Sequence, residues 1–199
     1  MENIKKLFSN EEIRDLIIVI LGVSLILSTP DFTSNLFVYL PIVGLSLFFR
    51  NLFNKKVANK LQCTTSFKLW PIGAFLGLIS IFIKPVFGIV FLALGYIEIT
   101  PYKFGRWGIK LIRMTPRDYA YISLSGIGLN LFLLIFCGIF YSINQLEIFR
   151  IIGLVNGLLA FFNLLPIPPL EGSHIFTWSF WTWATLLFFN ILILVTVII

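Results

Sequence analysis

Long uncharged stretches constrain the fold of this chain more than any other feature. Only 12% of its 199 residues are charged and 58% are hydrophobic, whereas a soluble domain is about 25% charged. A domain of this length cannot cover its surface with so few polar residues. Soluble globular and disordered folds are therefore excluded, and the sequence predicts an integral membrane protein.

Charged residues divide the chain into seven uncharged stretches, and a membrane-spanning helix needs about 20 mostly apolar residues. The stretches are 16–30, 32–49, 69–83, 85–97, 119–146, 151–170 and 172–199. The second and the last three are long enough, and the first is long enough if its helix starts near Ile13. We therefore expect an all-α polytopic membrane protein with about six transmembrane helices, forming a single domain over residues 1–199.

The basic residues indicate the orientation of the chain. The net charge is +6, and the loops 50–68 and 100–118 carry most of the Lys and Arg residues. Short basic loops prefer the cytoplasm, so we expect a multi-pass protein of the cell membrane with a cytoplasmic N-terminus. Since both loops then lie on one side, we interpret 69–97 as a helical hairpin that turns at Lys84-Pro85.

One of these loops, 100–118, has a regular spacing of cations. Helical spacings of 3 and 4 predict an amphipathic helix on the membrane surface, in contact with anionic lipid. The alternative is an ordinary cytoplasmic loop, because two glycines weaken the helix. The sequence lacks a basic stretch interleaved with aromatic residues, so we expect no nucleic-acid partner. The five cations are Lys103, Arg106, Lys110, Arg113 and Arg117.

The most unusual segment is residues 161–174. Three prolines, Pro166, Pro168 and Pro169, break a helix near the inner face of the membrane, shortly after Asn163. Glu171 and His174 follow the break, and ionisable groups at membrane depth mark functional sites. The alternative is that Glu171 is solvated at the interface and caps the next helix.

This segment resembles the Asn-x-x-Pro-x-x-x-Leu-Asp-Gly signature of the site-2 protease family of intramembrane zinc metalloproteases. Asn163, Pro166, Leu170 and Gly172 have the matching spacing, and Glu171 stands where the family has a zinc-binding Asp. Residues 125–130 are similar to the family's Ala-Gly-Pro-x-x-Asn segment, and 67–73 and 94–99 resemble linking segments of archaeal-type members. The resemblance covers a core of about 46–175.

The resemblance also implies a groove for an extended substrate and a zinc-binding His-Glu-x-x-His motif. The groove residues would be Asn163, Pro166, Pro168 and Pro169. The zinc motif should lie at the end of the second span, where this chain has the sequence Arg50-Asn-Leu-Phe-Asn54. The Lys-Lys-Val-Ala stretch that follows sets this alignment.

The aligned residues cannot perform the family's chemistry. Arg50 and Asn54 replace the two histidines, and Arg50 has no lone pair to donate to zinc. Asn51 replaces the general base and cannot accept a proton. Glu171 with His174, the one histidine of the chain, could form at most a loose two-ligand site. We therefore expect no zinc cofactor, and an ion pair between Arg50 and Glu171 in place of the metal.

The leading hypothesis is a catalytically inactive site-2-protease-like protein that binds a transmembrane segment or another membrane protein within the lipid bilayer. One alternative is an active intramembrane metalloprotease with unusual ligands. Another is a small transporter or membrane scaffold whose proline-broken helices line a polar path. Metal content and flux measurements would separate the three hypotheses.

Overall fold

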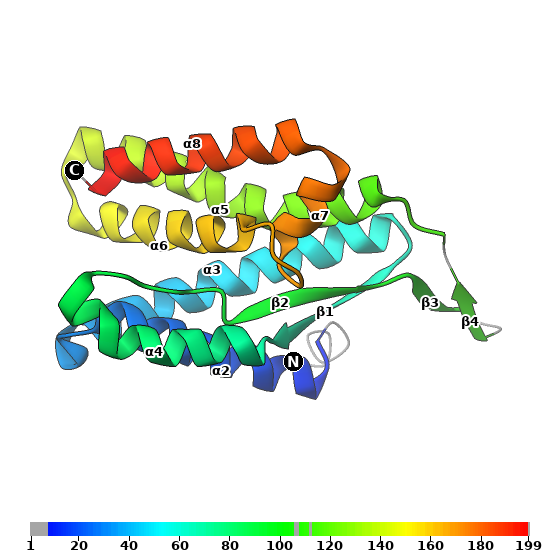
Figure 1. Ribbon diagram of the computed structural model, residues 1–199, viewed down its shortest axis with the longest axis horizontal. Helices are drawn as coiled ribbons and strands as arrows, with labels where there is room; N and C mark the ends of the chain where they lie inside the picture. The colour runs from blue at the N-terminus through cyan, green and yellow to red at the C-terminus, as the bar shows by residue number, and fades with distance from the viewer. Residues whose placement is uncertain (1–7, 106–107, 112, 199) are drawn as a thin grey trace. The chain divides into compact units, whose positions relative to one another are not determined.

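The computed structural model describes residues 8–105, 108–111 and 113–198 (Figure 1). The chain divides into two compact units. Unit 1 contains residues 1–47 and 66–98, and unit 2 contains residues 48–65 and 99–199. A single domain over residues 1–199 remains a prediction.

Helices make up most of both units, and the strands form two short pairs, β1 with β2 and β3 with β4. In chain order the elements are α2 (Asn10–Ser28), α3 (Phe32–Lys60), β1 (Thr64–Leu69), α4 (Pro71–Phe87), β2 (Gly95–Thr100), β3 (Tyr102–Gly105), β4 (Gly108–Leu111), α5 (Pro116–Asn144), α6 (Glu147–Leu164), α7 (Glu171–Trp178) and α8 (Phe180–Ile198).

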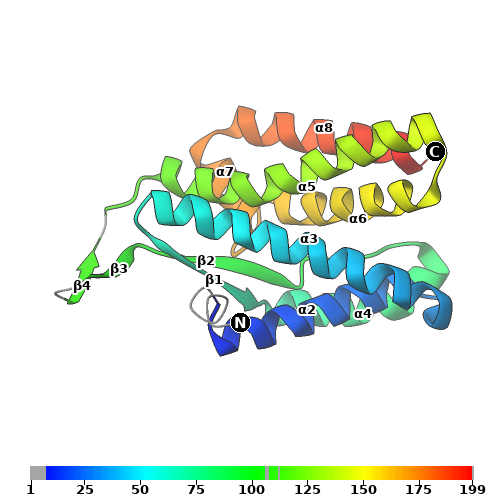
Figure 2. The same cartoon turned by 180° about the vertical axis from the view of Figure 1, so that it is seen from behind.

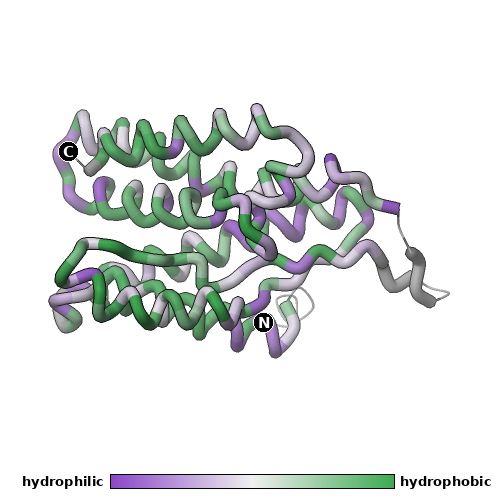
Figure 3. The backbone as a smooth tube through the Cα atoms, viewed as in Figure 1, coloured by the Kyte–Doolittle hydropathy of each residue, from purple (hydrophilic) through white to green (hydrophobic). Residues whose placement is uncertain are grey.

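The predicted all-α membrane fold is confirmed. Figure 3 shows mostly hydrophobic residues along α6 and α8. Within the described residues, four helical segments are long and apolar enough to cross a membrane: Asn35–Lys60, Pro116–Asn144, Glu147–Leu164 and Phe180–Val197. The helix break predicted at the prolines is also present, because α6 ends at Leu164 and α7 starts at Glu171.

Helices α2 and α4 correspond to the other predicted crossings. They pack side by side in unit 1 (Figures 1 and 2). Helix α2 has 19 residues but carries Glu11, Glu12, Arg14 and Asp15 near its start, and α4 has only 17 residues. Whether these two helices cross the whole bilayer remains a prediction.

The predicted turn at Lys84-Pro85 is wrong. Helix α4 continues through Pro85 to Phe87 and ends at Gly88, whose φ of 70° is left-handed. Because Pro85 lies in the last turn, its missing N–H removes a bond only near the helix end. Lys84 instead reaches α2, where its Nζ donates to the carbonyls of Ile26 (2.9 Å) and Leu27 (2.6 Å).

The expected second helix of that hairpin, 85–97, is also absent from the described structure. After α4 the chain is extended and enters β2, which pairs with β1. The extended backbone obtains other hydrogen-bond partners: Phe91 N donates to Ser80 Oγ (2.9 Å), and Trp70 N donates to Leu94 O (2.8 Å). Such non-local partners make a helix unnecessary here.

Two carboxylates of α2 bind the backbone of β1 within unit 1. Phe67 N donates to Glu12 Oε1 (2.9 Å), and Leu69 N donates to Asp15 Oδ2 (3.1 Å). Glu12 is 3% exposed. The N-terminal part of α2 therefore binds N–H groups that another strand would otherwise bind.

The predicted surface helix in 100–118 is wrong as well. Strands β3 and β4 form an antiparallel hairpin that pairs Lys103 with Lys110 and Gly105 with Gly108. The two glycines favour a strand turn over a helix. Arg106 and Trp107 of the predicted helix lie outside the described residues.

Unit 2 is built around α5, α6 and α8, which run side by side (Figures 1 and 2). Ile127 of α5 packs with Ala160 and Leu164 of α6 and with Ile175 of α7. The α6 carbonyl at Leu164, released by the proline break, accepts a bond from Trp183 Nε1 at 2.7 Å. Side chains of unit 2 thus fix the ends of the break.

Candidate functional site

Helix α3 supplies the first half of the site. Arg50 and Asn54 are one helical turn apart, so they lie on the same face of α3. Their side chains are buried, with 1% of Arg50 and 0% of Asn54 exposed. Both are in unit 2, as are all the contacts of the site.

Helix α7 supplies the second half. Glu171 is its first residue, directly after the proline-containing loop, and is 1% exposed. The loop turns so tightly that a Cβ on Gly172 would collide with the backbone carbonyls of Leu164 and Leu165. The turn holds Glu171 against the end of α6.

The predicted ion pair between Arg50 and Glu171 is present. Arg50 Nη2 lies 2.8 Å from Glu171 Oε1. Asn54 Nδ2 donates to the same oxygen at 3.1 Å. The carboxylate therefore has a cation and an amide donor on one oxygen.

Two neighbouring residues of α5 complete the network, and the sequence reasoning did not name them as site residues. Ser125 Oγ lies 2.9 Å from Asn54 Oδ1 and 2.7 Å from Ile122 O, and its one proton can be donated to either oxygen. Gly126 lies against Asn54, so a Cβ at this position would collide with the amide. The Ser-Gly pair in an apolar helix is the signal that the sequence offers, but Asn54, the partner of Ser125, is 71 positions away in the sequence.

Burial dominates the electrostatics of the site. It raises the pKa of the Glu171 carboxyl above its ordinary value, while the charge of Arg50 and the hydrogen bonds lower it. An ionised carboxylate in a buried position needs such partners. Removing either ionic partner would leave the other charge without its counterpart.

The residues present do not fit the zinc ion of the family. A catalytic zinc needs three protein ligands and an open position. Among the described residues, His, Cys, Asp and Glu nowhere gather in a group of three or more that could hold a metal. The guanidinium of Arg50 occupies the approach to Glu171 Oε1, and it repels a cation.

Asn163 and His174, two other predicted site residues, have partners elsewhere in unit 2. Asn163 Nδ2 donates to Leu159 O (2.7 Å) within α6. Asn51 is buried at 2% exposure. The ring of His174 stacks on Tyr119 at 5.4 Å, and burial lowers the pKa of its imidazole.

The proline-containing loop that precedes Glu171 is largely exposed. Pro166, Ile167 and Pro168 are exposed, and Pro169 is half-buried. The use of this loop and of Asn163 as a substrate groove remains a prediction.

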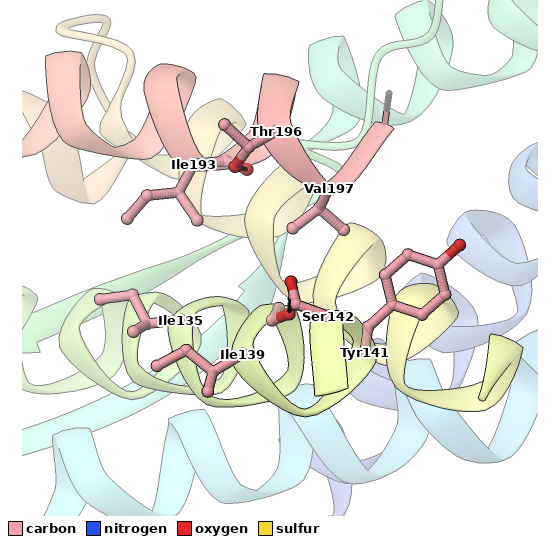
Figure 4. A pocket seen from close by; sticks show the side chains of 8 residues that line it. Ile135, Ile139, Tyr141, Ser142, Ile193, Thr196 and Val197 are labelled. Atoms are coloured by element: carbon pink, nitrogen blue, oxygen red, sulfur yellow. Dashed lines mark hydrogen bonds between the residues drawn. The ribbon is translucent and has the colours of Figure 1, made fainter. Parts of the chain in front are cut away.

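Two cavities lie in unit 2. One, of about 250 Å³, is lined by Met114, Pro116, Tyr119, His174 and Thr177. The other, of about 240 Å³, lies between α5 and α8 (Figure 4) and is mainly apolar. Among the predicted site residues, only His174 lines either of these two cavities.

Comparison with known proteins agrees with this architecture. The chain is 34% identical over 183 residues to a protein of Methanocaldococcus jannaschii named "Putative zinc metalloprotease", and the match covers 89% of each chain. No family model matches the sequence, and no solved structure matches it.

Spanning helices, the acid after the proline break and this relative define a metalloprotease-like membrane protein. The chain belongs to the site-2 protease family. The relative's name indicates zinc as the metal of the family, and the alignment of Arg50 and Asn54 with metal-binding histidines stays a prediction.

Proposed function

We propose that this protein is a catalytically inactive member of its family that binds a transmembrane segment of another membrane protein. The observation that carries the proposal is the buried pair of Arg50 and Glu171, two residues that the proposed alignment assigns to metal-ligand positions of the family. Asn51, at the general-base position, has an amide that cannot take a proton from water. The proposed orientation places the N-terminus on the cytoplasmic side.

Retention of the family's groove elements supports a binding role. Asn163, Pro166, Leu170 and Gly172 keep the signature spacing although the metal ligands are replaced. The exposed Pro-Ile-Pro loop offers a surface beside the site, and proline-flanked backbone carbonyls can accept hydrogen bonds from an extended segment. An apolar segment in the bilayer is the proposed ligand.

Purified protein should contain no stoichiometric zinc after incubation with the metal, because its site does not supply the three protein ligands that zinc needs. It should also leave a transmembrane reporter uncleaved. Mass spectrometric metal analysis and gel analysis of the reporter measure both results. Near-stoichiometric zinc together with cleavage would establish the active-protease alternative instead.

A variant with Arg50→His, Asn54→His and Glu171→Asp serves as the control for this measurement. It restores the three family ligands while keeping Asn51, so we expect it to bind about one zinc without becoming a protease. If this variant folds and still takes up no zinc, the alignment of these positions with the metal site is wrong.

A photo-reactive residue at Ile167 should cross-link to a synthetic transmembrane peptide that carries an Asn-Pro helix break at its centre. The break exposes backbone groups that a groove can bind. Ile148, in the first turn of α6, provides a matched control because it has the same exposure, 47%. Equal cross-linking at the two positions would contradict a binding role for the loop.

A further inference from the structure

A cluster of exposed cations lies outside the candidate site. Lys56 and Lys60 are in the last two turns of α3, and Arg113 and Arg117 flank Pro116 at the start of α5. All four side chains are exposed. We call these four residues the basic end of unit 2.

Packing brings the two helix ends together. Ala58 and Cys63 are buried against Ile122, and Met114 packs on the same cluster. Asn54, one turn before Ala58 on α3, lies against Gly126, which is one turn after Ile122 on α5. The two helices therefore run antiparallel, so the four cations share one end of the helix pair.

The basic end coincides with the limits of two membrane spans. The span in α3 ends at Lys60, and the span of α5 starts at Pro116. Side chains at the limits of a span lie at the depth of lipid headgroups. The cations are therefore placed where phosphate groups of a bilayer are found.

The carboxylates of unit 2 are engaged with other partners. Asp118 accepts bonds from Thr115 N and Oγ1, both at 2.8 Å. Glu171 is buried with Arg50, and Glu147 binds Arg150 at the other end of α5 and α6. Unit 2 has these three acids only, and Asp118 is the one of them beside the four cations, so the basic end keeps a net positive charge.

Aromatic side chains stand beside the cations, as they do at membrane interfaces. Arg117 Nε donates to Tyr121 Oη (2.8 Å), and its guanidinium lies 5.1 Å from the centroid of that ring. The ring of Tyr121 contacts Trp178 edge-on at 5.6 Å. These contacts hold Arg117 at the rim of the helix bundle.

We propose that the basic end binds the headgroups of acidic phospholipids in the adjoining leaflet. A juxtamembrane Lys or Arg gains attraction from anionic lipid that decays within a Debye length. We therefore retain the predicted contact with acidic lipid, but we assign it to the ends of α3 and α5 instead of to a surface helix in 100–118. The proposal is independent of the proposed function.

Spin-labelled lipids in reconstituted bilayers test the proposal directly. The protein should hold labelled phosphatidylglycerol at its surface several-fold more strongly than labelled phosphatidylcholine, and about 0.5 M salt should remove most of this preference. Replacement of all four cations by Gln should reduce the preference to about one. A preference that withstands salt, or that the fourfold variant keeps, would overturn the proposal.

Single variants provide a charge-matched comparison. Arg113→Gln and Arg150→Gln each remove one exposed or half-exposed cation, but Arg150 is at the opposite end and is paired with Glu147 at 3.4 Å. We expect Arg113→Gln to lower the lipid preference and Arg150→Gln to leave it unchanged. An equal loss in both variants would show that net charge, rather than the basic end, attracts the lipid.

Discussion

Replacing Arg50 with Met should destabilise the protein by about 3–5 kcal/mol, because Glu171 then remains buried without its cation. Arg50 is 1% exposed, so water cannot take the place of its guanidinium without rearrangement. Unfolding of the purified protein in mixed micelles by increasing SDS measures the change in free energy. Glu171→Leu should have a similar cost, because it leaves the buried Arg50 without an anionic partner.

The double variant Arg50→Met, Glu171→Leu distinguishes the cost of losing the whole ion pair from the cost of leaving one charge without its partner. Well-packed apolar residues often replace a buried pair without loss of stability, so this variant should unfold near the wild-type SDS concentration. Arg150→Met is the surface control, with an expected cost of only about 0–1 kcal/mol. If Arg50→Met costs no more than Arg150→Met, the buried pair has no special structural role.

Gly172→Ala should be the second damaging substitution. The added Cβ would collide with the carbonyls of Leu164 and Leu165, which are main-chain atoms and cannot rotate away. Overpacking of this kind costs about 1–3 kcal/mol or more, and the shift would also move Glu171 away from Arg50. The same SDS titration measures this loss.

Gly128→Ala is the matched control for that variant. Gly128 lies inside α5, and a Cβ there meets no atom within 4 Å. Alanine in a helix interior is favoured over glycine by about 0.5–1 kcal/mol, so this variant should be as stable as wild type or more stable. Equal destabilisation by the two substitutions would mean that steric contact at Gly172 is not the cause.

The spans and the ion pair could be predicted because they depend on strong, local rules. Uncharged stretches of sufficient length leave few folds other than membrane helices. The pair of Arg50 and Glu171 followed from charge complementarity once both residues were aligned with one metal site. Burial then makes an unpaired charge costly, which is why the prediction holds in the structure.

The wrong predictions and the missed residues have different physical reasons. Five cations at spacings of 3 and 4 favour a surface helix, but hydrogen bonding between β3 and β4 determines the structure in much of this segment. Pro85 is a turn signal in sequence, yet near a helix end its cost is small. Ser125 and Gly126 were missed as site residues because only the packing of α5 on α3 brings them to Asn54.

The contacts of Glu12 and Asp15 with β1 have a consequence for the synthesis of the chain. These carboxylates receive hydrogen bonds from Phe67 and Leu69, which the ribosome adds more than 50 residues later. Two strands alone are marginally stable in water, so β1 and β2 depend on α2 being in place when they form. We therefore expect the β1–β2 pair to become stable only after both strands have been synthesised and have met the carboxylates of α2.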